Sequence, residues 1–63
     1  MAKGIIKWFN KEKGFGFITP DGGERDLYFQ EADLETEVID GQRVEYEETM
    51  SRKGPAATYI HGI

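Results

Sequence analysis

The sequence predicts an all-β fold in which five short antiparallel strands curl into a small barrel. Eight glycines and two prolines divide the 63 residues into short segments, which are filled by aromatic and β-branched residues. A chain of this length buries only about 60% of the surface that its unfolded form exposes. Closing the sheet enlarges the interior and removes most free strand edges. We therefore expect one domain over residues 1–63.

Strands and turns follow one another in a regular order along the chain. The expected strands span residues 3–10, 14–19, 25–30, 43–50 and 56–61. Residues 20–23 read Pro-Asp-Gly-Gly, which favours a tight turn and predicts a hairpin between the second and third strands. Gly41 and the pair Gly54 and Pro55 mark further turns.

Residues 31–40 show no alternation of apolar and polar residues and contain five acidic ones. We expect a loop there, with one helical turn. A helix over the whole segment is the alternative, but without a sustained apolar face it would be marginal.

The segment 14–19 places two aromatic side chains on one face. Successive side chains of a strand point to opposite faces, so Phe15 and Phe17 share one face and Gly16 and Ile18 the other. We expect Ile18 to point into the barrel core. The two phenylalanines then point outward beside Lys13, an unusual arrangement for residues that only face water.

The same reasoning applies to the third strand. Burying Leu27 and Phe29 turns Asp26, Tyr28 and Gln30 outward. Because the turn at 20–23 pairs this strand with the preceding one, Tyr28 is expected to lie near the outward phenylalanines.

In the first strand, strict alternation cannot expose both Lys7 and Trp8. A bend or bulge would bring both to the surface and leave Ile6 and Phe9 for the core.

These outward rings form a predicted aromatic platform with lysines along its edge. The rings are Trp8, Phe15, Phe17 and Tyr28, and the lysines are Lys3, Lys7, Lys11 and Lys13. Aromatic rings stack unpaired bases and ammonium groups hold phosphates, so this pattern favours single-stranded nucleic acid. The alternatives are that the rings belong to the core and that the lysines form an ordinary solvated face.

Charge is unevenly distributed along the chain. The net charge of −4 and the pI near 4.8 by themselves argue against a ligand that is a polyanion. However, residues 1–20 carry +3, residues 21–50 carry −9 and residues 51–63 carry +2. A ligand at the platform would therefore meet a basic N-terminal third.

Several classes of protein are excluded or unsupported. The chain has no cysteine and one histidine, His61, which excludes disulfide scaffolds, thiol nucleophiles and Cys/His zinc sites. No nucleophile is suggested by its spacing to His61, so we expect no enzyme and no cofactor. Mean hydropathy is −0.61 and apolar runs are short, so we expect no signal peptide, no membrane span and a cytoplasmic protein.

Motifs spread over nearly the whole chain resemble those of a bacterial-type cold-shock domain. They are Lys3-Gly4, Lys7-Trp8-Phe9-Asn10, Lys13-Gly14-Phe15-Gly16-Phe17-Ile18, Asp26, Gly41-Gln42, and Gly54-Pro55 with Ala57. The resemblance implies a five-stranded OB-fold barrel that binds single-stranded RNA or DNA. It also implies an RNA chaperone or a regulator of transcription or translation.

The resemblance assigns roles to individual residues. Those expected to contact nucleic acid are Lys7, Trp8, Lys13, Phe15, Phe17 and Tyr28, with Asp26 at a base edge and Lys53 in a basic loop next to Arg52. Where the family has a histidine and then an aromatic residue, this chain has Gln30 and Glu31. Gln30 still offers a donor and an acceptor to a base, whereas Glu31 removes a ring and adds negative charge.

The loop at 31–40 is also shorter than usual and contains no aromatic residue, which leaves a platform of four rings. We expect a monomer that binds pyrimidine-rich strands weakly. The alternative is an acidic OB-barrel protein-interaction module with weakened nucleic-acid binding. In it the face formed by residues 31–48, including Glu45, Glu47 and Glu48, would dock a basic partner, although an acidic face can also be only solvated.

Overall fold

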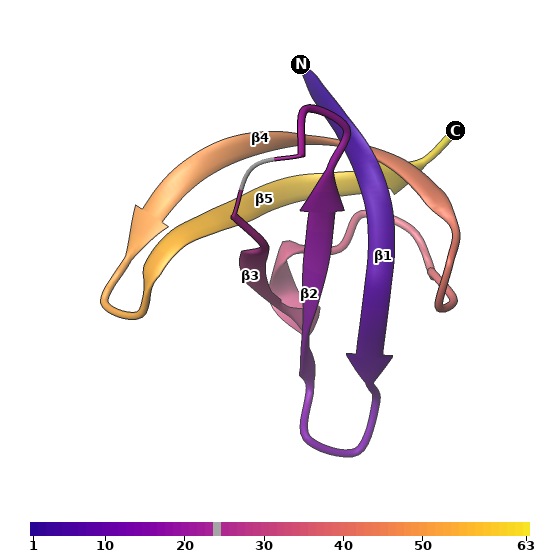
Figure 1. Cartoon of the computed structure of the whole chain (residues 1–63). Helices are drawn as coiled ribbons and strands as arrows, with labels where there is room; N and C mark the ends of the chain where they lie inside the picture. Colours follow the sequence, from indigo (N-terminus) through magenta and orange to yellow (C-terminus); the bar gives the residue numbers. More distant parts are fainter. Residues whose placement is uncertain (24) are drawn as a thin grey trace.

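The computed structural model describes residues 1–23 and 25–63 and contains five strands and one 3₁₀ turn (Figure 1). The elements are β1 (Ala2–Asn10), β2 (Phe15–Pro20), β3 (Leu27–Gln30), η1 (Glu31–Asp33), β4 (Arg43–Ser51) and β5 (Gly54–Gly62). The predicted strands are confirmed, and their ends agree with the observed ones within two residues. The single helical turn expected in residues 31–40 is η1.

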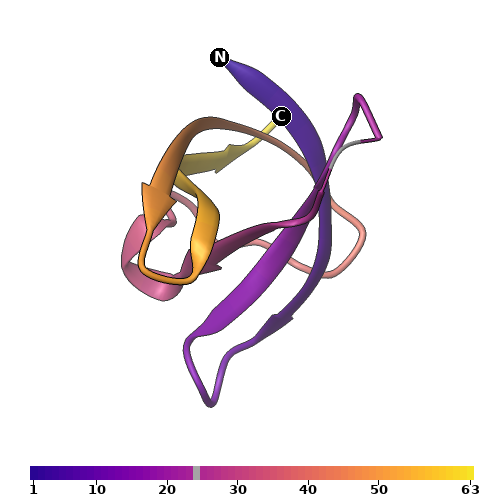
Figure 2. The ribbon, with the colours of Figure 1, turned by 60° about the vertical axis from the view of Figure 1, so that its left-hand side comes forward.

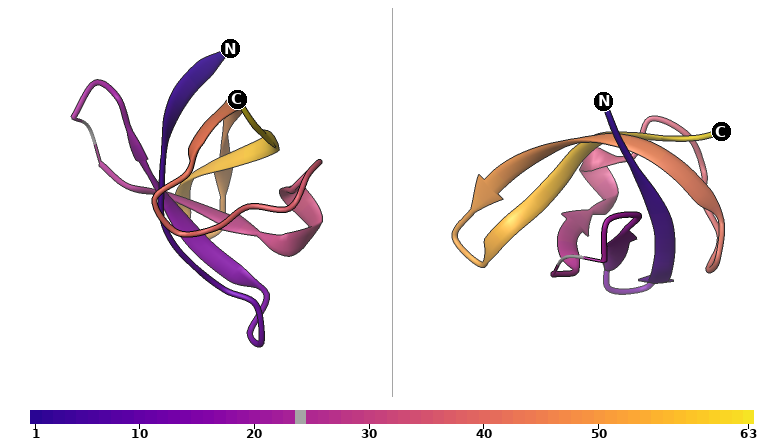
Figure 3. Two further views of the ribbon diagram at one scale, coloured as in Figure 1. Left: turned by 90° about the vertical axis from the view of Figure 1, so that its right-hand side faces the viewer. Right: turned by 45° about the horizontal axis from the view of Figure 1, so that its top comes forward.

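The strands form a closed barrel in the order β1-β2-β3-β5-β4. Figures 2 and 3 show β4 and β5 as a long curved hairpin, with both chain termini at the end of the barrel opposite the β1–β2 loop. The OB-type all-β fold is thus confirmed. Within residues 1–23 and 25–63 no helix has the length and apolar character needed to cross a membrane.

One pairing differs from the antiparallel sheet that the sequence predicts. The contact between β3 and β5 is parallel and has one paired position, Tyr28 with Ala56. The other four pairings are antiparallel. A closed ring with an odd number of strands cannot alternate direction all the way round, so closure requires at least one parallel neighbour.

A bulge in β1 sets the direction of its side chains. Ile6 pairs with Ile18 and Trp8 with Phe17, which leaves Lys7 as the extra residue. Lys7 is exposed, Trp8 is half-buried and Ile6 is fully buried, so the predicted bulge and its effect are confirmed.

The barrel interior is filled from every strand. Its buried members are Ile6, Ile18, Leu27, Phe29, Val38, Val44, Tyr46, Ala57 and Ile60. Ile18, Leu27 and Phe29 are inward as alternation predicts, and Phe9 packs on Phe29 with ring centroids 5.6 Å apart. Leu34 and Val38 add apolar surface from the segment after η1, which the sequence pattern did not predict.

The turns predicted at residues 20–23 and at Gly41 are present, whereas the third turn is formed by Arg52 and Lys53, and Gly54 and Pro55 already belong to β5. The N–H of Gly23 donates to the carbonyl of Pro20 (3.2 Å), and Gly23 has φ +75°. Gly41 and Gly54 also have positive φ, at +85° and +108°, a conformation that glycine adopts without steric cost.

Gly16 lies where two strands and a core ring approach most closely. A Cβ atom at this position would lie 2.3 Å from the carbonyl oxygen of Trp8 and 2.9 Å from both Phe29 Cζ and Phe9 Cα. Two of these three atoms belong to the backbone and cannot swing away. Hence β1 and β2 approach this closely only because residue 16 has no side chain.

We expect Gly16→Ala to lower the free energy of unfolding by about 3 kcal/mol, because β1 must move away from β2. Gly14→Ala is the matched control: nothing lies closer than 3.7 Å to its Cβ position, and only the strain of φ +74° applies. That strain is worth about 1 kcal/mol. Urea denaturation measures both variants, and equal losses would contradict the steric argument.

Tyr59 is the one described non-glycine residue with positive φ, at +50°. It lies in the irregular stretch of β5, where the register with β4 shifts between Glu45 and Glu47. Its side chain is 55% exposed, so its contribution to packing is small.

We expect Tyr59→Asn to raise the free energy of unfolding by about 0.5–1 kcal/mol, because asparagine tolerates this backbone conformation better than tyrosine. The neighbouring Thr58→Asn relieves no such strain and should not stabilise the protein. Thermal unfolding of the two variants compares them, and a lower midpoint for Tyr59→Asn would refute the expectation.

Candidate nucleic-acid interface

The four rings of the aromatic platform form one contiguous cluster on the outer face of β1, β2 and β3. Trp8 meets Phe15 and Phe17 edge-to-face, with ring centroids 5.4 and 5.3 Å apart. Tyr28 lies 5.9 Å from Phe15 and 5.8 Å from Phe17. Each ring is half-buried, so the cluster is held by its own contacts while part of every ring meets solvent.

Strand register explains why these rings meet. Phe17 is paired with both Trp8 on β1 and Tyr28 on β3, so it is the central ring of the platform. Gly16 and Ile18, on either side of Phe17, are buried on the opposite face. The expected closeness of Tyr28 to the two phenylalanines is confirmed.

Lys53 covers part of the platform. Its Nζ lies 4.9 Å from the centroid of the Tyr28 ring and 5.8 Å from that of Phe15. Lys53 belongs to the β4–β5 turn, where its N–H donates to Ser51 Oγ (3.1 Å) and Ser51 Oγ–H donates to the carbonyl of Gly54 (3.0 Å). The turn therefore places a cation over two rings, where the electron-rich ring faces attract it.

Lys7 and Asp26 form an ion pair at the edge of the platform. Lys7 Nζ lies 2.7 Å from Asp26 Oδ2, and Thr19 Oγ1 donates to Asp26 Oδ1 (3.3 Å). The hydrogen bond from the Lys7 ammonium is the main reason that the pKa of Asp26 lies below its usual value of 3.8, and the positive charge and Thr19 act in the same direction. Asp26 is therefore an acceptor that stays ionised in mildly acidic solution.

The remaining predicted residues differ in position. Gln30 is exposed and its Nε2 donates to Tyr28 Oη (3.1 Å), which joins it to the platform. Lys13 is exposed in the β1–β2 loop. Lys3 lies opposite Glu45 in the β1–β4 pairing, and Lys11 lines a groove beside η1. No described contact joins either of these two lysines to the rings, so their predicted place at the platform's edge stays a prediction.

Two contacts at the platform were not predicted from the sequence: that of Thr19 with Asp26 and that of Lys53 with the rings. Thr19 faces Asp26 across the β2–β3 hairpin, and the pairing of Ile18 with Leu27 carries the signal, since both flanking positions are outward. The contact of Lys53 with the rings depends on how β4 and β5 curve, and no local pattern predicts that curvature.

A family model described as the 'Cold-shock' DNA-binding domain matches residues 2–63. The chain belongs to the cold-shock domain family. Cold shock-like protein CspE of Escherichia coli K12 is 45% identical over 62 residues, which cover 92% of this chain and 90% of that protein. Cold shock-like protein CspA of Bordetella pertussis Tohama I is 42% identical over 64 residues, covering 95% and 96%. The cold shock protein of Arthrobacter globiformis is 44% identical over 64 residues, with the same coverage.

Within this cold-shock domain, the acidic side of the molecule begins where the platform ends. Gln30 pairs with Phe15 at the end of β3, and the next residue, Glu31, donates its N–H to the carbonyl of Gly14 (2.9 Å). The backbone of Glu31 is therefore held at the end of the β2–β3 ladder, so this residue adds a negative charge next to Phe15 in the pairing.

We expect Lys7→Met to raise the pKa of Asp26 towards its usual value, because the main donor to the carboxylate is lost. A carboxyl-detected NMR titration measures the pKa directly. Lys3→Met, which removes the same charge from β1 away from Asp26, is the control and should leave this pKa unchanged.

The same pair makes stability depend on pH. The pKa of Asp26 is lower in the folded than in the unfolded state, so the pair stabilises the fold above pH 3.8. That stabilisation is lost as the pH falls through the folded pKa. A pKa of Asp26 that is the same in the wild-type protein and in Lys7→Met would contradict this account.

Proposed function

We propose that this cold-shock domain binds single-stranded RNA and DNA by stacking bases on the aromatic platform. The observation that carries the proposal is the contiguous, part-exposed cluster of Trp8, Phe15, Phe17 and Tyr28. Every base has a π-face, so such a surface accepts many sequences, and each stacked ring is worth about 1–3 kcal/mol. The ring-to-ring contacts also fix the rings in advance, which lowers the entropy cost of binding.

Cations around the platform supply the attraction for phosphates. Lys7, Lys13 and Lys53 carry the charge, and we assign Asp26 and Gln30 to the base edges. Lys7 is bound to Asp26 and Lys53 lies over the rings, so nucleic acid must compete for two of the three cations. We therefore infer weak binding with a modest salt dependence.

Pyrimidine-rich strands are the proposed preference. Pyrimidines stack less strongly on one another than purines do. Less stacking free energy is therefore lost when a pyrimidine unstacks from its strand and stacks on a protein ring. Weak contact with unpaired strands suits an RNA chaperone or a regulator of transcription or translation, because binding only the unpaired state shifts structured RNA towards it by mass action. We propose that the protein acts in this way as a cytoplasmic, monomeric single domain.

Titration of heptameric oligothymidine tests the proposal, with fluorescence of Trp8, the only tryptophan in the chain, as the signal. We expect quenching that weakens with salt, with a slope of log Kd against log salt near 2 if three lysines contact phosphate, since each contact contributes about 0.7. Phe17→Ala should raise Kd by roughly 5- to 150-fold, the equivalent of one lost stacking ring.

Tyr59→Asn serves as the matched control, because Tyr59 is an exposed aromatic residue outside the platform. Its Kd should equal that of the wild-type protein. No quenching at high micromolar oligothymidine, or an equal loss of affinity in both variants, would refute the proposal.

A further inference from the structure

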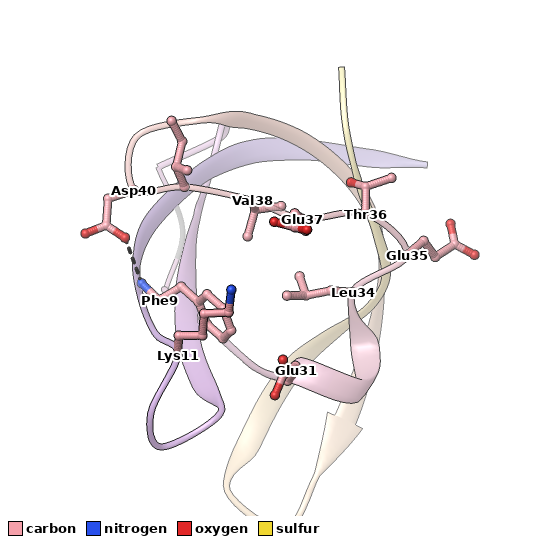
Figure 4. Close-up of a pocket in the computed structure, with 10 residues that line it drawn as sticks. Phe9, Lys11, Glu31, Leu34, Glu35, Thr36, Glu37, Val38 and Asp40 are labelled. Atoms are coloured by element: carbon pink, nitrogen blue, oxygen red, sulfur yellow. Dashed lines mark hydrogen bonds between the residues drawn. The ribbon is translucent and has the colours of Figure 1, made fainter.

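A groove of about 650 Å³ opens beside η1, between the end of β1 and the segment that follows η1 (Figure 4). Its position differs from that of the platform. Phe9 follows Trp8 directly in β1, but the Phe9 side chain turns to the other side of the strand and packs against Phe29. Neighbouring residues of one strand thus serve two separate surfaces.

The groove is built on apolar side chains. Phe9, Leu34 and Val38 point inward in Figure 4, and the first two pack against the core. Ile39 also lines the groove. Its side chain is 72% exposed and is not part of the hydrophobic core. An apolar lining with an unburied isoleucine favours an occupant that brings apolar surface of its own.

The rim of the groove is acidic. Its lining includes four acidic residues, Glu31, Glu35, Glu37 and Asp40, and one basic residue, Lys11. The Glu35 carboxylate points away from the groove in Figure 4, and its Oε1 lies 3.5 Å from Nδ1 of His61. Within the described part of the chain, Glu31 and Glu37 make no ion pair. Asp40 Oδ1 accepts the N–H of Phe9 (3.0 Å), which holds the rim to β1. The groove therefore repels phosphates and attracts cations.

We propose that this groove binds a basic peptide segment in which an apolar residue lies between arginines or lysines. Arginine and lysine have apolar stems and charged ends, so the stems would lie along the lining while the ends reach the rim carboxylates. The volume lies within the range of about 300–1,000 Å³ that is usual for ligand sites. The partner is thus a protein with an exposed basic segment, and this site is independent of the platform.

The test uses the ¹⁵N-labelled protein and a blocked hexapeptide of alternating arginine and leucine, at low salt. We expect the amide signals of Phe9, Leu34 and Val38 to shift in a saturable way. Glu37→Lys reverses one rim charge and Ile39→Ser removes the exposed apolar side chain. Each should weaken peptide binding by about fivefold or more, which corresponds to roughly 1 kcal/mol.

Two matched variants distinguish specific binding in the groove from nonspecific electrostatic attraction of a basic peptide to an acidic protein. Glu47→Lys makes the same charge change on β4, and Met50→Ser removes a residue that is 73% exposed and lies outside the groove. Both should bind the peptide like the wild-type protein. Equal weakening in all four variants, or shifts confined to the platform, would overturn the proposal.

A heptameric oligothymidine provides the remaining comparison. Shifts at the groove amides with oligothymidine but not with the peptide would mean that the groove continues the nucleic-acid site, and the proposal would be wrong. Quenching of Trp8 reports on the platform separately, so failure of one proposal is distinguishable from failure of the other.

Discussion

The structure depends on the close approach of β1 and β2 at Gly16. A Cβ atom on this residue would clash with the carbonyl oxygen of Trp8. This approach allows the Phe29 ring to fill the space beneath the two strands, and it fixes Trp8 beside Phe17. The bulge at Lys7 then has a defined effect, because the strand on either side of it is held in register. A glycine between two phenylalanines thus determines both the inner packing and the outer ring cluster.

Two of the three cations around the platform already have partners. Lys7 is bound to Asp26, and Lys53 lies over Tyr28 and Phe15. Binding of a phosphate or base is therefore an exchange of partners, and the net gain is smaller than the same cations would provide if they were free. The excess of acidic groups beside η1 acts in the same direction on a polyanion. On a cation it acts in the opposite direction, so the two proposed sites would favour ligands of opposite charge.

Much of the fold could be predicted because alternation in strands is a local property. Ile18, Leu27 and Phe29 point inward and Phe15, Phe17 and Tyr28 outward, as their spacing indicates. The bulge followed from a conflict, since Lys7 and Trp8 could not both be exposed without one. The parallel closure, the apolar lining from Leu34 and Val38, and the position of Lys53 depend on where distant segments meet. Local sequence patterns carry no information on such tertiary contacts.

The parallel contact between β3 and β5 is one of two junctions between β1–β2–β3 and the β4–β5 hairpin, and the two sides carry different groups. All four platform rings lie on β1, β2 and β3, whereas Lys53 lies at the tip of the β4–β5 hairpin. The β3–β5 junction has one paired position, Tyr28 with Ala56, whereas the β1–β4 junction has four. Residues after η1 add to this junction, because Leu34 bridges to Ile60 and the N–H of Glu35 donates to the carbonyl of Ile60 (2.7 Å). Lys53 reaches the rings of Tyr28 and Phe15 from the far side of the junction, so the cation and the rings beneath it belong to opposite sides of the barrel closure.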